Sequence, residues 1–174
     1  MVNAAQAIPI VPAEEHERRV RRQNSELKEI WDLLDAVKDP EVPVLSLWDL
    51  GVLQDVREQS GGLVVSITPT YSGCPALEAM REDIVEVLQV NGYTKVQVET
   101  RLLPAWTTDW LSESARQHLK GFGISPPVQH LDQVLCPLCG SPATRLISEF
   151  GSTACKALYQ CSDCQEPFDY FKTI

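Results

Sequence analysis

The sequence has few basic residues, few histidines and no long apolar run. Lysine and arginine together number 15 against 24 acidic residues, and the formal net charge is −9. Because a nucleic-acid groove needs a basic surface, this balance argues against a nucleic-acid partner. No stretch approaches the roughly 18 apolar residues of a membrane helix, and the beginning of the chain lacks the pattern of a secretory leader. We therefore expect a cytoplasmic protein with no membrane partner and with reduced thiols.

The main basic cluster lies near the N-terminus and consists of Arg18, Arg19, Arg21 and Arg22. Acidic residues lie beside it and apolar residues are scarce in this part of the chain. Such a composition is typical of a solvated tail or of the fraying start of a helix, so residues 1–24 are predicted to be disordered. A basic arm that binds a partner is the less favoured interpretation.

Four of the six cysteines form two C-x-x-C pairs near the C-terminus. Cys136 and Cys139 make the first pair and Cys161 and Cys164 the second, with 21 residues between the pairs. Two such knuckles can bring four thiolates to one tetrahedral metal, with Zn–S bonds of about 2.3 Å. A disulfide would need an oxidising compartment, and a redox C-x-x-C normally follows a strand of a thioredoxin-like unit. The spacing therefore predicts a structural zinc ribbon over residues 126–174, where apolar side chains alone are too few to form a core.

Residues 25–125 have the pattern of a small α+β domain. The expected elements are helices over 25–38, 75–89 and 112–120 and strands over 52–58, 63–68 and 93–102. A Gly-Gly turn at 61–62 joins the first two strands as a hairpin. The order strand, helix, strand implies a right-handed crossover, so the third strand should lie parallel to the second in a mixed αββαβ sheet.

Cys74 lies between Gly73 and Pro75, where a strand is expected to give way to a helix. A thiolate beside the unpaired N–H groups of a helix start is favoured, which makes Cys74 a candidate nucleophile or metal ligand. An inert core cysteine is the alternative. No histidine that could act as a base is near it in sequence, which weighs against a thiol-dependent enzyme. Asp39 and Glu41 follow the first helix, and taken alone they are best interpreted as turn and capping residues.

Three motifs occur in a fixed order in the first domain: Asp39-Pro-Glu-Val-Pro43, Trp48-Asp-Leu-Gly51 and Thr68-Pro-Thr70-Tyr-Ser-Gly-Cys74-Pro75. Together they resemble the motifs of the small domain in SufT-type iron–sulfur assembly factors. The later segments 103–110 and 123–127, followed by the ribbon, resemble one branch of that family, the PaaD proteins of bacterial phenylacetyl-CoA epoxidase systems. The resemblance covers residues 25–174. The chain departs from the wider family at Pro69, Tyr71 and Ser72, so the loop before Cys74 is expected to have its own geometry.

The resemblance implies an accessory role in phenylacetate degradation rather than catalysis. In that role the chain would help to mature iron or iron–sulfur cofactors of the oxygenase or reductase subunits, which would be its partners. Cys74 would be the cofactor-handling thiol, with Asp39, Glu41 and Thr70 around it. Besides structural zinc, the implied cofactor is a transient iron ion or iron–sulfur cluster. A homodimer stays open.

Two other functional classes stay open at this stage. The chain could be a structural subunit of the multicomponent monooxygenase, or it could transfer electrons if the four cysteines held iron as in rubredoxin. The second pair, Cys161-Ser-Asp-Cys164, lacks the Pro and Gly typical of rubredoxin.

Cys155 and two tryptophans have no role assigned by the motifs. Cys155 precedes Cys161 by six residues and is interpreted first as a packing residue under the ribbon, with a second functional thiol or a metal ligand as alternatives. Trp106 and Trp110 lie four residues apart. Core packing is the favoured interpretation for them, and an exposed docking surface for the oxygenase partners is the alternative.

Overall fold

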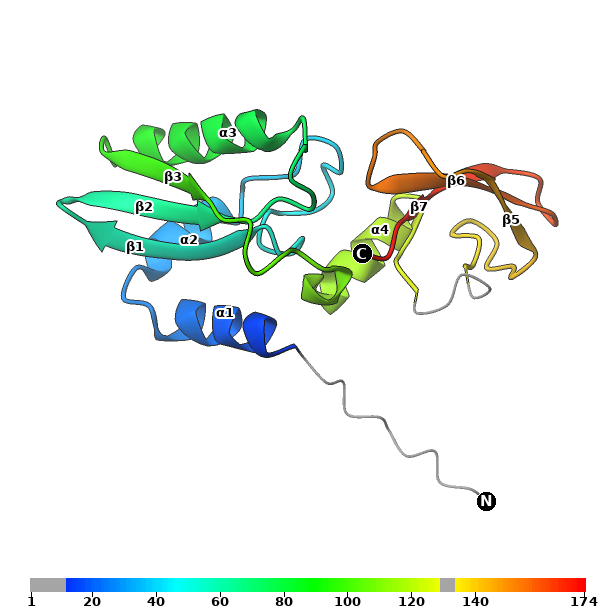
Figure 1. Cartoon of the computed structure of the whole chain (residues 1–174), viewed down its shortest axis with the longest axis horizontal. Coiled ribbons are helices and arrows are strands. Elements are labelled where there is room, and N and C mark those ends of the chain that lie inside the picture. Colours follow the sequence, from blue (N-terminus) through cyan, green and yellow to red (C-terminus); the bar gives the residue numbers. More distant parts are fainter. Residues whose placement is uncertain (1–11, 129–133) are drawn as a thin grey trace, which may run out of the picture.

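The described part of the protein, seen here as a computed structural model, forms one sheet over residues 53–100 and a second over residues 124–171 (Figure 1). The structure describes residues 12–128 and 134–174. The architecture confirms the predicted α+β domain followed by a ribbon. No helix in the described part of the chain combines the length and the apolar character needed to span a membrane.

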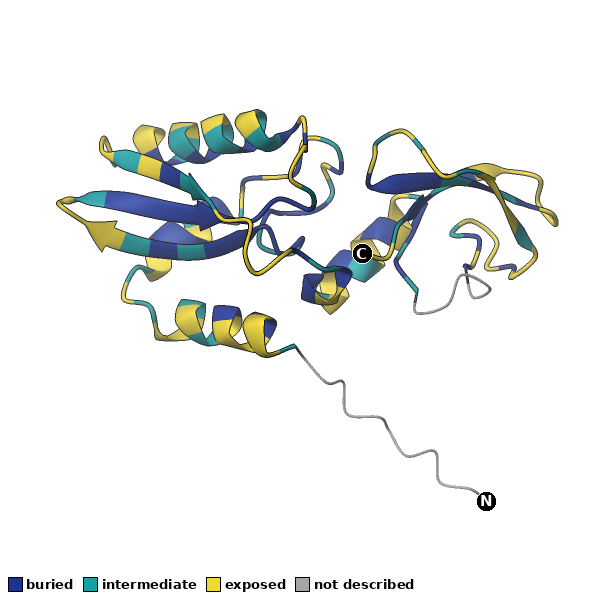
Figure 2. Cartoon of the chain, viewed as in Figure 1, coloured by how far each residue is buried: buried dark blue, intermediate teal, exposed yellow. Residues whose placement is uncertain are grey.

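The N-terminal domain is built on a three-stranded sheet in the order β1-β2-β3. Strand β1 (Leu53–Gln59) is antiparallel to β2 (Gly62–Ile67), and β3 (Val96–Thr100) is parallel to β2. Ser60 and Gly61 both have a positive φ, which the tight hairpin turn between β1 and β2 requires. The hairpin and the parallel crossover were both predicted and are both confirmed. Strand β2 is the centre of the sheet and is buried along most of its length (Figure 2).

Two helices complete the predicted pattern of this domain. Helix α3 (Leu77–Val90) makes the crossover between β2 and β3, and helix α2 (Lys28–Leu34) packs against it. Helix α2 is shorter than the predicted helix over 25–38, because the preceding residues link it to another helix and the chain turns away after Leu34. Ile30, Trp31 and Leu34 nevertheless bury the face that the apolar spacing predicted.

The expectation of a disordered tail over residues 1–24 is wrong for its second half. Helix α1 (Ala13–Asn24) lies along β1, while residues 1–11 lie outside the described residues. Arg18 is only 1% exposed; its Nη1 donates to the carbonyls of Trp48 and Leu53 at 2.9 and 3.0 Å. Its guanidinium pairs with the buried carboxylate of Glu15 at 2.6 Å and stacks 3.9 Å from the centre of a Trp48 ring. One arginine of the basic cluster is therefore a buried anchor for the helix.

The ribbon domain has four strands in the order β4-β7-β6-β5. Its elements are β4 (Ile124–Ser125), β5 (Thr144–Ser148), β6 (Lys156–Cys161) and β7 (Pro167–Phe171). Strand β4 precedes the predicted boundary at residue 126 and pairs in parallel with β7, so the connection between the domains enters the ribbon sheet. Its small core includes the stacked rings of Tyr159 and Phe168.

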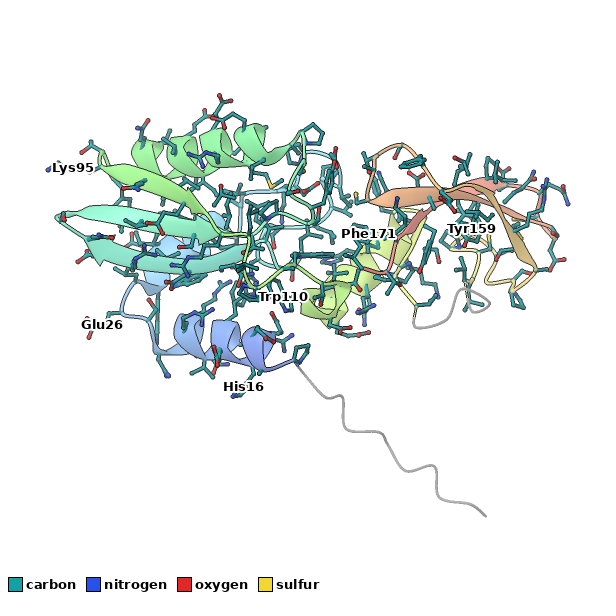
Figure 3. All side chains as sticks on the ribbon, viewed as in Figure 1. His16, Glu26, Lys95, Trp110, Tyr159 and Phe171 are labelled. Carbon is teal, nitrogen blue, oxygen red and sulfur yellow. The ribbon has the colours of Figure 1, made fainter. Side chains whose placement is uncertain are left out.

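The two domains meet around the 3-10 helix η1 (Thr108–Trp110), helix α4 (Glu113–Gly121) and the end of β7. Trp106 and Trp110 are 3% and 2% exposed. The Trp106 indole donates to the Leu50 carbonyl at 3.0 Å and lies 6.2 Å from the ring of Phe171, which is labelled at the junction in Figure 3. Both tryptophans are therefore packing residues, as favoured from the sequence, and neither forms an exposed docking surface.

Candidate functional site

The four ribbon cysteines converge on one point. The sulfurs of Cys136 and Cys164 lie 3.7 Å apart and those of Cys139 and Cys161 lie 3.6 Å apart, and all four lie within 4.8 Å of one another. Tetrahedral zinc with Zn–S bonds of about 2.3 Å would place its sulfurs about 3.8 Å apart. The donor set and its spacing therefore fit zinc, which would hold the two knuckles together as a closed structural site.

The two knuckles share a local backbone geometry. The residue after each pair, Gly140 in the first and Gln165 in the second, has a positive φ of 76° and 65°. The backbone N–H of Cys164 points at the sulfur of Cys161 at 3.5 Å. This N–H group, together with that of Asp163, lowers the pKa of Cys161 to about 7. The knuckle thus favours the thiolate form of Cys161, as zinc ligation requires.

A second group of thiols and carboxylates lies near the start of α3. Cys74 lies in the loop between β2 and α3, and is 8% exposed. Helix α3 begins at Leu77, so the thiol precedes the helix by three residues instead of flanking its first turn. Burial raises the pKa of Cys74 above its ordinary value, and the N–H of Ala76 offsets this only in part. The expectation that the helix start would favour the thiolate is therefore reversed by burial and by nearby negative groups.

Asp39 and Glu41 reach the same region from the connection between α2 and β1. Asp39 is 5% exposed, and its Oδ1 accepts hydrogen bonds from the N–H groups of Glu41 and Val42 at 2.8 and 2.7 Å. Burial raises the pKa of Asp39. Burial and then the charge of Asp39 raise the pKa of Glu41 as well. Asp39 therefore shapes the turn, as the sequence favoured, and the turn presents the carboxylate of Glu41 towards the ribbon.

The loop before Cys74 supplies two more side chains. Thr70 is buried in this loop, and Tyr71 packs against the core of the N-terminal domain. Burial, followed by the charges of Cys74, Glu41 and Cys155, raises the pKa of Tyr71 to about 12. Tyr71 is therefore a neutral phenol beside the thiol. Sequence analysis gave it no role, although its departure from the family pattern was the signal that could have drawn attention to it.

Sequence analysis also missed Lys156, and it favoured packing under the ribbon for Cys155. Lys156 Nζ donates to the carbonyl oxygen of Glu41 at 3.4 Å, and the sulfur of Cys155 lies 3.8 Å from Glu41 Oε2. Cys155 packs with the core of the N-terminal domain and not under the ribbon. Nothing in the local sequence relates these residues to Glu41, because more than one hundred positions separate them.

Two family models match the chain. The model for an iron–sulfur cluster assembly protein matches residues 27–100, and the model for the PaaD zinc β-ribbon domain matches residues 126–172. The first covers the sheet of the N-terminal domain together with Asp39, Glu41, Thr70 and Cys74. The second covers the four cysteines of the zinc site and Cys155.

Two curated relatives and a solved structure are similar to the chain. A protein of Escherichia coli, named as the D component of a "Putative 1,2-phenylacetyl-CoA epoxidase", is 53% identical, covering 86% of this chain and 94% of its own. An "Fe-S protein maturation auxiliary factor" of Porphyromonas gingivalis is 35% identical, covering 53% of this chain and 89% of its own. A crystal structure of a domain of unknown function, DUF59, from Bacillus anthracis is 24% identical with a TM-score of 0.49, covering 60% and 95% of the two chains. The chain therefore belongs to the PaaD family of phenylacetyl-CoA epoxidase components, in which a zinc β-ribbon follows an iron–sulfur cluster assembly domain.

Proposed function

We propose that this chain is an accessory component that helps to install iron, as an ion or within an iron–sulfur cluster, in the oxygenase or reductase subunits of a phenylacetyl-CoA epoxidase. The observation that carries the proposal is the position of Cys74. Its thiol lies within electrostatic range of Asp39 and Glu41 in a site separate from the closed zinc site. The names of two relatives support this proposal, since one is named as an epoxidase component and the other as a maturation factor.

The chemistry of the group suits a cargo that must be passed on. A thiolate and carboxylates can both bind iron, and a site with few ligands holds a metal less tightly than four thiolates do. Cys74 would be the ligand, Glu41 would add an oxygen donor, and Asp39 would hold the turn that carries Glu41. Thr70 would support the loop that positions the thiol. In this role the chain would not take part in turnover of phenylacetyl-CoA.

The test is the iron content of the partner subunits. The oxygenase and reductase subunits are produced without this chain, with it, and with its Cys74→Ala variant, and their iron and epoxidase activity are measured. We expect iron and activity to fall together without the chain, and Cys74→Ala to fail to restore them. Ser72→Ala, an exposed change in the same loop, is the matched control and should restore both.

Two outcomes would contradict the proposal. Fully loaded partners in the absence of the chain would rule out maturation. Normal loading by Cys74→Ala would remove Cys74 from the mechanism. In each preparation the zinc content of the variant shows that its ribbon is folded.

A further inference from the structure

Two consecutive residues of the ribbon contact Glu41 across the junction between the domains. Cys155, just before β6, places its sulfur 3.8 Å from Glu41 Oε2, and Lys156, the first residue of β6, donates from Nζ to the Glu41 carbonyl oxygen at 3.4 Å. From the other side, the N–H of Glu41 donates to Asp39 Oδ1 at 2.8 Å. The backbone of Glu41 is thus held from both domains, through its N–H by the N-terminal domain and through its carbonyl group by the ribbon.

Lys156 is itself fixed inside the ribbon. Its side chain is 5% exposed, and its Nζ lies 3.5 Å from Asp169 Oδ2 on the neighbouring strand β7. Asp169 also accepts hydrogen bonds from the N–H and the hydroxyl of Ser152 at 3.4 and 2.6 Å. A buried ammonium group needs such partners, because its desolvation is costly. The ribbon therefore determines where Lys156 meets the carbonyl group of Glu41.

Strand β6 connects Lys156 to the zinc site. The strand begins at Lys156 and ends at Cys161, one of the four zinc-site cysteines, and it pairs with both β5 and β7. The loop before β6 is tightly packed, since a Cβ added at Gly151 would lie 2.6 Å from Asp169 Oδ1. Zinc at one end of β6 would therefore stabilise the strand whose other end contacts Glu41.

We propose that Lys156 is a positioning residue for Glu41: acting from the ribbon, it holds the turn that presents the Glu41 carboxylate to iron. This inference rests on the maturation function proposed above, in which Glu41 adds an oxygen donor, and it gives the ribbon a part in that function beyond its own folding. Lys156 does not touch the iron in this role, because its contact is with the backbone of the turn. Replacing a residue that orients a metal ligand typically costs about 10- to 100-fold in metal affinity or activity.

The test is a double-mutant cycle in the full chain with its zinc bound. Iron loading of the oxygenase and reductase subunits is measured with Glu41→Gln, with Lys156→Met and with both changes together. We expect each single variant to slow loading at least about tenfold. The double variant should be no slower than Glu41→Gln alone, because the carboxylate that Lys156 positions has already been removed.

Two further lysine variants separate positioning from a general effect on the ribbon. Lys172→Met is the matched control, since Lys172 lies on the same ribbon but its Nζ donates to the Glu149 carbonyl oxygen at 3.1 Å. It should load the partners as the wild type does. Lys156→Arg keeps a cationic donor at the same position and should recover part of the loading that Lys156→Met loses.

Hydrogen exchange followed by mass spectrometry tests the same contact without any partner subunit. In Lys156→Met, residues 39–45 should exchange faster than in the wild type, while β7 keeps its protection and zinc stays bound. If Lys156→Met loses zinc and so fails to fold, Asp169→Asn replaces it, because that change removes only the charge partner of Lys156. It should also speed exchange over residues 39–45 and slow loading.

Three results would overturn the inference: unchanged exchange over residues 39–45, normal loading by Lys156→Met with zinc bound, or losses that multiply in full in the double variant. The maturation function survives each of them, because loading can still depend on the chain and on Cys74. Fully loaded partners in the absence of the chain would instead end the maturation function, and with it the role of Glu41 that Lys156 supports.

Discussion

The two domains of this chain are stabilised in different ways. The core of the N-terminal domain is broad and apolar, and it also takes in Cys155 and Phe171 from the ribbon. The separate core of the ribbon is small. The four cysteine sulfurs of its two knuckles are positioned to bind one metal ion. A large apolar core does not need a metal, whereas a small domain with little to bury often does. The comparison explains why four thiols gather at one point in the ribbon, whereas apolar packing holds the N-terminal domain.

Removing zinc should give the largest difference in stability between the two domains. A structural zinc contributes about 10–16 kcal/mol to the folding of small zinc-finger peptides. With Cys136→Ser, or after chelation of the metal, we expect strands β5, β6 and β7 to lose protection while β1–β3 keep theirs. Hydrogen exchange followed by mass spectrometry measures this, together with the zinc content. Unchanged protection of β6 in the metal-free chain would contradict the contrast between the domains.

Arg18→Ala should destabilise the N-terminal domain and leave the zinc ribbon unchanged. Removing the guanidinium leaves the buried carbonyl groups of Trp48 and Leu53 without their donor, although Arg19 still pairs with Glu15 at 2.6 Å. We expect a loss of about 3 kcal/mol in the free energy of unfolding of the N-terminal domain. Zinc content should not change, because the hydrogen-bond partners of Arg18 in the described part of the chain, Glu15 and the carbonyls of Trp48, Leu53 and Trp110, lie outside the ribbon. Denaturant unfolding measures the loss.

The matched control for Arg18 is Arg21→Ala, which removes an exposed arginine of the same helix. Its ion pair with Glu17 is long, at 3.8 Å. Exposed pairs of this kind contribute about 0–1 kcal/mol. An equal loss in both variants would mean that Arg18 is not the anchor of α1.

The smallest expected effect is the contribution of the Asp49 carboxylate to the free energy of unfolding, and this contribution depends on pH. Burial raises its pKa, but hydrogen bonds from Ser112, Ser46 and Ser114 outweigh burial, so the pKa lies below its ordinary value. A lowered pKa in the folded state stabilises the protein above the unfolded pKa of about 3.9, and this stability is lost as the pH falls through the folded pKa. Because Asp49 is partly exposed, solvent screening limits the effect to about 1 kcal/mol.

The measurement is the free energy of unfolding of the wild type and of Asp49→Asn between pH 3 and pH 7 (about one unit below and three units above the unfolded pKa). The variant should be less stable at neutral pH, and the difference should shrink below about pH 4. Asp109→Asn, at an exposed position, should show no such change. A difference that stays constant across the range would show that the serines do not favour the carboxylate of Asp49.

Local patterns in the sequence predicted the fold where the determinants lie close together. The hairpin at Gly61, the crossover through α3 and the convergence of two C-x-x-C pairs all depend on spacing within short segments. Helix α1 was missed because its composition is polar and its main anchor, Arg18, is a charged residue. The apolar pattern cannot reveal a helix that docks through a guanidinium group, backbone carbonyls and an indole ring.

In the candidate site, too, some residues could be predicted from local motifs and others could not. The family motifs indicated Cys74, Asp39, Glu41 and Thr70, and their roles remain proposals. The position of Cys155 opposite Glu41 could not be predicted, because it depends on how the ribbon packs against the N-terminal domain. Burial also reversed the pKa direction expected for Cys74 from its place before a helix.

The sequence alone determined the two-part α+β and ribbon architecture, the four-cysteine site and the family, because each rests on short-range spacing or on motifs along the chain. Only the tertiary structure decided that α1 is docked, that the two tryptophans are buried, and that Cys155 of the ribbon lies opposite Glu41 of the N-terminal domain. These features depend on contacts between residues far apart in sequence, with Cys155 and Glu41 separated by 114 positions. Burial and charge at such contacts arise from the packing of whole domains, which local spacing does not encode.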